Sequence, residues 1–138
     1  MKRLLSGLTA AATLLSTPAV MAAEWVNVAK NSVGDAFSID KSAIQRNGDI
    51  VRYWEFREFP QPNNAFLEEA VEQPVHGVVI GWSADCASMI QRLRQVTAYD
   101  KNRKLIQRFT YGDAGSLAQP KPGSSAYTAL KYVCDFKE

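Results

Sequence analysis

Two cysteines, Cys86 and Cys134, follow an amino-terminal leader that is typical of an exported chain. In an oxidising compartment, an even number of cysteines is most simply interpreted as paired. On the chain-entropy model, closing this loop would stabilise the fold by about 4 kcal/mol. The alternative is a redox or nucleophilic thiol, but the chain has no CxxC motif and one histidine, His76. We therefore predict a structural Cys86–Cys134 disulfide.

The leader occupies residues 1–22. Lys2 and Arg3 form a positive start, an uncharged and mostly apolar stretch follows, and small residues favour cleavage after Ala22 or Ala23. This pattern predicts a cleaved secretory signal peptide. A permanent membrane anchor is the alternative, although the stretch is weakly apolar for a span of about 20 residues. No cysteine lies near the cleavage site, so we expect a periplasmic or cell-surface protein without a lipid anchor.

Removal of the leader changes the charge of the chain. The precursor has 16 lysines and arginines against 14 acidic residues, and Lys2 and Arg3 leave with the leader. The mature chain is then balanced, which gives no reason to expect nucleic acid as a partner. Residues 23–138 have the length of one domain with one core, without an internal repeat or a transmembrane segment.

Alternation of apolar and polar residues predicts an antiparallel sheet of about six strands, separated by turn signals such as Asn47-Gly48. The expected strands are 25–30, 36–40, 50–59, 75–83, 88–99 and 104–111. A single helical turn is expected at 41–44. Residues 63–73 are either a short helix capped by Asn64 or an irregular excursion.

The last element is helical. Ser124 or Ser125 can cap a helix that runs to about Val133. Its apolar stripe consists of Ala126, Tyr127, Leu130, Val133 and Cys134. Because Cys134 lies on this stripe, its bond to Cys86 joins the helix to the sheet. The predicted fold is therefore α+β: an antiparallel sheet with a carboxy-terminal helix packed on one face and tethered by the disulfide.

The strand at 50–59 carries large apolar residues on both faces. One face has Ile50, Trp54 and Phe56, and the other has Val51, Tyr53 and Phe59. A helix of about ten residues covers only part of one face of such a sheet. This suggests a second covering, either a long loop or another subunit. The alternative is that the aromatic residues are singly exposed, which is ordinary on a protein surface.

No catalytic set emerges from the sequence, and we predict no catalytic, cofactor-binding or metal residues and no cofactor. His76 cannot form a two-histidine zinc site, and we interpret it as a structural or surface residue. Glu68 and Glu72 would share a face of a short helix, as solvated surface residues do. Ser124 and Ser125 lack the G-x-S-x-G context of a nucleophile.

Five basic residues cluster on the last two predicted strands and their turn: Arg92, Arg94, Arg103, Lys104 and Arg108. They form either a patch for an acidic partner, such as a sulfated polysaccharide, or edge-strand charges that prevent sheet-to-sheet aggregation. The second interpretation is favoured.

Four segments are distinctive in their order along the chain: residues 37–44 (FSIDKSAI), 85–87 (DCA), 97–100 (TAYD) and 126–134 (AYTALKYVC). Together they resemble the surface-adhesin protein E family. The resemblance implies a disulfide-tethered helix on an antiparallel sheet, a homodimer, and adhesion through host proteins such as vitronectin and laminin. The family's namesake is a lipoprotein, and the missing lipidation cysteine is a departure from it.

We therefore expect a non-enzymatic exported binding protein. The alternative is a soluble periplasmic accessory or structural protein of the cell envelope with no host ligand. An enzyme would require convergent polar groups around His76 or Glu68.

Overall fold

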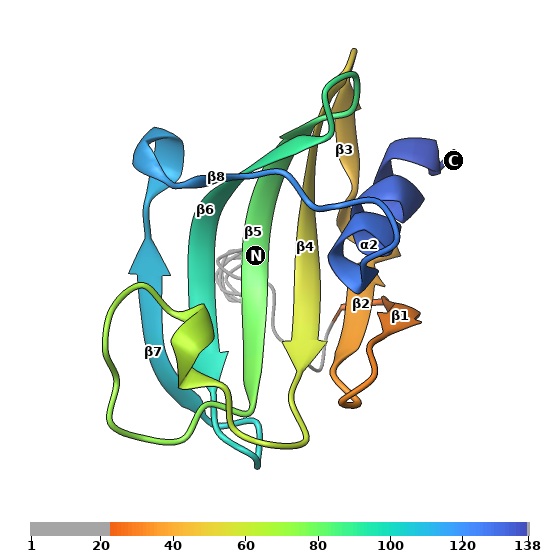
Figure 1. Ribbon diagram of the computed structural model, residues 1–138. Helices are drawn as coiled ribbons and strands as arrows, with labels where there is room; N and C mark the ends of the chain where they lie inside the picture. The colour runs from red at the N-terminus through yellow and green to blue at the C-terminus, as the bar shows by residue number, and fades with distance from the viewer. Residues whose placement is uncertain (1–22, 138) are drawn as a thin grey trace, which may run out of the picture.

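Within residues 23–137, which the computed structural model describes, eight strands form one antiparallel sheet and one α-helix packs on it (Figure 1). The strands are β1 (Trp25–Lys30), β2 (Ala36–Asp40), β3 (Gln45–Asn47), β4 (Ile50–Glu58), β5 (Gly77–Asp85), β6 (Ile90–Tyr99), β7 (Leu105–Thr110) and β8 (Leu117–Ala118). The 3₁₀ turns are η1 (Lys41–Ala43), η2 (Asn64–Phe66) and η3 (Gly112–Ala114), and the helix is α2 (Ser125–Asp135). The predicted signal peptide lies outside the described residues.

The strand order is β1-β2-β4-β5-β6-β7, with β3 pairing on β4 and β8 on β6. The central pair, β4 and β5, is in register from Ile50–Asp85 to Glu58–Gly77. Six strands thus form the main path, as predicted. The two short additions, β3 and β8, were not predicted.

The main core lies between the sheet and α2. Ile39, Val51 and Ile80 of the sheet have no solvent exposure, and neither do Leu130 and Val133 of the helix. Burying side chains of this size stabilises the fold by about 1.5–3 kcal/mol each. The buried residues of α2 are Ala129, Leu130 and Val133, so the stripe is rotated from the predicted one, and Tyr127 lies on its flank.

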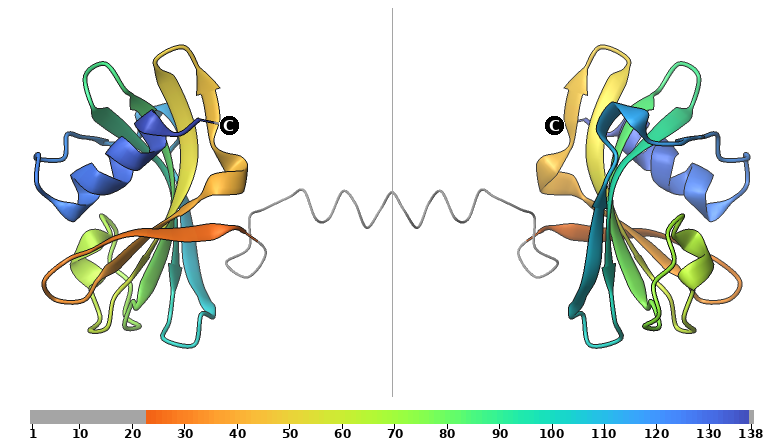
Figure 2. Two further views of the ribbon diagram at one scale, coloured as in Figure 1. Left: turned by 90° about the vertical axis from the view of Figure 1, so that its right-hand side faces the viewer. Right: turned by 90° about the vertical axis from the view of Figure 1, so that its left-hand side faces the viewer.

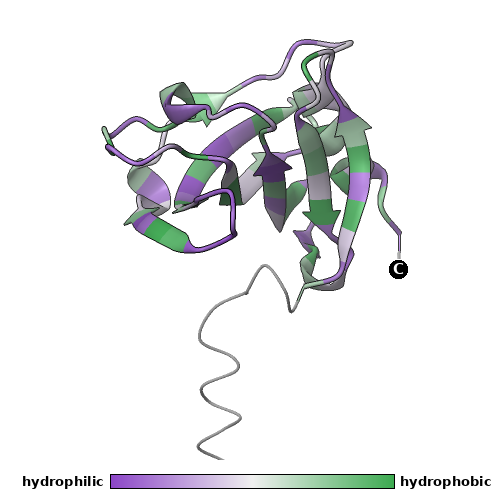
Figure 3. Cartoon of the chain, turned by 90° about the horizontal axis from the view of Figure 1, so that it is seen from below, coloured by the Kyte–Doolittle hydropathy of each residue, from purple (hydrophilic) through white to green (hydrophobic). Residues whose placement is uncertain are grey.

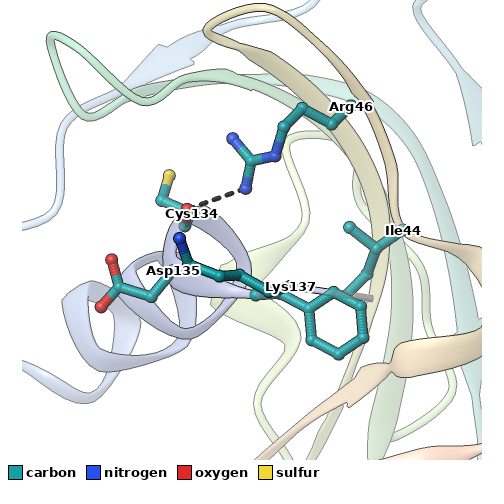
Figure 4. A pocket seen from close by; sticks show the side chains of 6 residues that line it. Ile44, Arg46, Cys134, Asp135 and Lys137 are labelled. Carbon is teal, nitrogen blue, oxygen red and sulfur yellow. Dashed lines mark hydrogen bonds between the residues drawn. The ribbon is translucent and has the colours of Figure 1, made fainter.

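Three contacts fix the ends of α2. The Ser124 side chain accepts a hydrogen bond from the Tyr127 amide at the start of the helix. At its end, Cys134 is bonded to Cys86 with 5.6 Å between the Cα atoms, which confirms the predicted disulfide. Arg46 of β3 donates to the carbonyl of Val133 at 3.1 Å. It also donates to the carbonyl of Cys134 at 2.8 Å (Figure 4). This guanidinium neutralises the negative end of the helix dipole.

We call the face of the sheet on which α2 packs the inner face. The connection between β4 and β5 covers the part of this face that α2 leaves uncovered. Phe66, Leu67 and Val71 pack against the main core. The connection is irregular apart from η2, and the Asn64 side chain holds it together by donating to the Val71 and Gln73 carbonyls and accepting from the Val75 amide. The sequence left open whether a long loop or another subunit completes the cover of the sheet. On this face it is a long loop.

Figure 3 shows the strands banded alternately in apolar and polar colours, as the period of two requires. Among the described residues, no helix is both long and apolar enough to cross a membrane.

Candidate functional site

The two faces of the sheet are covered unequally. α2 and the β4–β5 connection lie on the same side of the sheet (Figures 1 and 2). We call the opposite side the open face. Its apolar residues form a separate cluster, in which Phe56, Val79 and Tyr99 are buried and Trp25 and Trp54 are partly buried.

The aromatic rings of the open face lie over glycines. A Cβ atom on Gly81 would meet three atoms of the Trp54 ring at 3.0–3.4 Å, and one on Gly77 would meet the Phe56 ring at 3.1 Å. Trp54 and Gly81 are direct partners across β4 and β5. The indole therefore lies flat on the backbone of β5, a position that any larger residue at 81 would disturb.

A hollow of about 340 Å³ opens beside Trp54, and we call it the Trp54 hollow. Its lining includes the following residues with polar or indole side chains, besides Tyr53 and Trp82: Gln45, Arg52, Trp54, Arg94, Gln95 and Thr110. Arg52 is exposed, and Arg94 pairs with Asp113 at 2.9 Å. The Asp113 side chain is 93% exposed and lies outside the lining, so none of the acidic residues that the structure describes lines the hollow.

Two exposed apolar side chains border the same face further along the strands. Ile50 is 45% exposed and Leu117 is 60% exposed, and both line a second hollow that also includes Arg92. We call Ile50 and Leu117 the apolar rim. The Arg92 guanidinium donates to the carbonyls of Asp113 at 3.1 Å and Gly115 at 2.9 Å, which holds the segment leading to Leu117 against β6.

The family model for surface-adhesin protein E matches residues 25–135 of the chain. The chain belongs to the surface-adhesin protein E family. No curated protein sequence matches it.

Solved structures of Haemophilus influenzae protein E have the same fold. Crystal form II is similar with a TM-score of 0.56 and 15% identity, covering 87% of this chain and 94% of the other. The selenomethionine form gives 0.55 and 16%, covering 87% and 92%. At this identity the likeness concerns the fold. The predicted family and the predicted α+β fold are both confirmed.

In this adhesin-family chain, His76 lies where β4 and β5 diverge. Its Nδ1 is 3.1 Å from the Phe59 carbonyl, and its amide donates to the Tyr99 carbonyl at 3.0 Å. It also lines a hollow of about 460 Å³ with Tyr99 and Arg103. These contacts agree with the structural role predicted for His76.

The acidic group at 68–72 differs from its prediction. Since η2 ends at Phe66, Glu68 and Glu72 do not share a helical face. Instead, Glu68 accepts a hydrogen bond from Ser116 at 2.6 Å and Glu69 accepts one from Tyr111. Burial and the bond to Glu69 raise the pKa of Tyr111. The two glutamates therefore fasten the β4–β5 connection to the segment after β7.

Four of the five basic residues make separate side-chain contacts. Arg92 and Arg94 contact the η3 region, Arg103 pairs with Glu58 at 2.9 Å, and Arg108 donates to the Thr97 hydroxyl at 3.2 Å. The edge-strand interpretation fits Arg108 on β7, but Arg92 and Arg94 lie on β6, inside the sheet. Across residues 23–137, no group of three or more potential metal ligands occurs.

Trp54, Arg52 and Gln95 were not predicted as site residues. The alternation in β4 placed Trp54 on one face, but the glycine that forms its floor is 27 positions further along the chain. Only the register of β4 on β5 brings the two together.

Proposed function

We propose that residues 23–138 form a mature, exported, non-enzymatic binding protein that docks a protein partner on its open face. The observation that carries the proposal is that this face has no covering layer among the described elements but carries Trp54, arginines and the apolar rim. Aromatic residues and arginine are enriched where protein interfaces gain most of their binding energy. Membership of an adhesin family supports the same assignment.

We infer that the partner is a host extracellular-matrix or serum protein, with vitronectin and laminin as the first to test. This inference comes from the family resemblance. The apolar rim supplies the area that such a partner would bury, and the balanced charge of the mature chain imposes no strong repulsion on the approach.

The test measures binding of the mature chain to immobilised vitronectin and laminin. Ile50→Asp and Leu117→Asp should each weaken saturable binding about tenfold, the loss expected when an interface contact of about 1.4 kcal/mol is removed. Val33→Asp is the matched control, because Val33 is 71% exposed in the β1–β2 turn. No saturable binding to either protein, or an equal loss in the control, would overturn the assignment.

Cell fractionation separates this proposal from the periplasmic alternative. A surface adhesin should be accessible to added protease on intact cells. Release of the chain with the periplasm, without accessibility on intact cells, would favour the accessory role.

A further inference from the structure

We propose that the Trp54 hollow binds an anionic pyranose, a uronate or sulfated sugar unit of an acidic polysaccharide. The proposal goes beyond the proposed function and rests on it only for the use of the open face. It is carried by three features of the hollow: a flat indole, two guanidinium groups, and polar side chains that have no partner within the described chain.

The indole offers a stacking surface. Gly81 leaves space for the Trp54 ring to lie flat on β5, so one ring face is against the backbone and the other is directed to the hollow. The face of an aromatic ring is electronegative. The C–H bonds on one side of a pyranose ring carry partial positive charge and pack well on such a face.

The charges of the hollow select an anionic sugar. Arg52 makes no hydrogen bond or ion pair with any residue that the structure describes. Arg94 shares one guanidinium nitrogen with the exposed Asp113. A planar guanidinium binds carboxylate or sulfate oxygens through paired N–H donors. Within residues 23–137, no acidic side chain that would oppose this lines the hollow.

Three further side chains are available for sugar hydroxyls. Gln45, Gln95 and Thr110 line the hollow from β3, β6 and β7, and among the described residues none of their side-chain polar groups has a hydrogen-bond partner. Side-chain amides and hydroxyls can both donate and accept hydrogen bonds, so they can satisfy sugar hydroxyls, which do the same. These groups surround a flat aromatic floor and so suit a polyhydroxylated ring, which has hydroxyls at its edge and C–H bonds on its face.

The experiment measures binding of the mature chain to hyaluronan oligosaccharides, dextran sulfate, neutral dextran and poly-glutamate. Binding to hyaluronan, to dextran sulfate, or to both supports the proposal, and the pattern identifies carboxylate or sulfate as the anion. Trp54→Ala and Arg52→Ala should each weaken that binding at least tenfold. Arg108→Ala, which removes the same charge from the open face outside the hollow, should change it less than twofold.

Gly81→Ala provides an independent variant, because its Cβ would lift the indole while every polar group stays in place. It should weaken sugar binding at an unchanged far-ultraviolet dichroism spectrum. Since Arg52 is exposed, Arg52→Ala keeps the test valid even if Trp54→Ala fails to fold.

Two results would overturn the proposal: absent binding to both acidic glycans, or glycan binding that Trp54→Ala and Arg52→Ala leave unchanged. If the chain binds poly-glutamate with the same affinity as hyaluronan, and Arg52→Ala weakens both equally, the hollow would be assigned to an acidic protein segment instead. Ile50→Asp and Leu117→Asp should preserve glycan binding, so failure of the protein-docking proposal is distinguishable from failure of this one.

Discussion

Glu55 is a carboxylate inside the main core, with 1% of its side chain exposed. It accepts hydrogen bonds from the Trp82 indole at 2.7 Å and from Arg57 at 2.9 Å and 3.4 Å. Arg57 in turn lies over the rings of Phe37 and Phe66, at 4.8 and 5.2 Å. The carboxylate thus connects the sheet to the β4–β5 connection through a single arginine.

Glu55→Ala should therefore lower the free energy of unfolding by about 3–5 kcal/mol, because it leaves the Arg57 charge without its partner in a largely buried site. Glu58→Ala is the matched control, since Glu58 and Arg103 form a half-exposed pair that contributes about 1 kcal/mol or less. Urea unfolding of both variants measures the difference. Equal losses would contradict the role given to Glu55.

The sequence does not reveal this arrangement. Arg52, Glu55, Arg57 and Glu58 all resemble solvated strand charges, and nothing local distinguishes the exposed Arg52 from the buried Glu55. The phase of β4 turns Glu55 inward, and its indole partner Trp82 comes from another strand. A buried ion pair depends on tertiary partners, so local patterning could not predict it.

At the scale of elements, the β6–β7 hairpin depends on Asp100. Its carboxylate accepts from the amides of Asn102 at 2.8 Å and Lys104 at 2.9 Å. The hydrogen bond from the Lys104 amide is the main cause that lowers the pKa of Asp100 below the ordinary value of 3.8. Because the folded-state pKa is the lower one, the stabilisation is complete above the unfolded-state pKa and is lost as the pH falls through the folded-state value.

Asp100→Ala should accordingly destabilise the chain at pH 7 but have no effect at pH values below the folded-state pKa. Urea midpoints of the wild type and the variant, compared from pH 7 to pH 2, measure the convergence. Asp113→Ala serves as the control, because its carboxylate is exposed and forms a surface pair with Arg94. A pH-independent difference for Asp100→Ala would show that the carboxylate charge is not involved.

The anchoring of α2 gives a second prediction at this scale. Cys134→Ser should lower the free energy of unfolding by about 4 kcal/mol and increase hydrogen exchange in α2 first. Arg46→Ala should lower the free energy of unfolding by less, about 1 kcal/mol. Arg46 is exposed, and its substitution removes only hydrogen bonds to the last carbonyls of the helix. An unchanged melting temperature of Cys134→Ser in oxidising buffer would contradict the anchoring role.

Strongly patterned elements were predictable and short polar ones were not. β1 and β2 match their predicted bounds, since alternation and flanking turns define them. β3 consists of Gln45, Arg46 and Asn47, which have no apolar pattern and become a strand only by pairing with β4. The β4–β5 connection likewise depends on Asn64 reaching residues 71–75, a contact without a local signature.

At the scale of the whole molecule, the two faces of the sheet are covered unequally. The sequence indicated that α2 alone could not cover the sheet, but not which face would stay uncovered. Apolar residues on both faces of β4 showed that more than a helix was needed. One further cover is the β4–β5 connection on the inner face. The open face could not be assigned in advance, because the Trp54 hollow takes its lining from several strands whose register is set by the complete sheet.

We expect the mature chain to form the homodimer that the family resemblance implies, through the outer edge of β7. The main strand path ends at β7, and Leu105 on this strand is 56% exposed. Two such edges pair around a twofold axis without covering the apolar rim. Lys104 and Arg108 place positive charge along this edge of both copies, so the dimer should be weak at low salt and strengthen as salt screens the repulsion.

Sedimentation equilibrium across protein and salt concentrations measures this association. Leu105→Asp should shift the chain to the monomer, whereas Val33→Asp, at a still more exposed apolar position in the β1–β2 turn, should leave the mass unchanged. A monomeric wild type at every salt concentration would exclude the dimer. A dimer that Ile50→Asp disrupts and Leu105→Asp does not would place the contact on the open face, where it would compete with the proposed partner. The mass measurement therefore also decides whether the open face is free to bind.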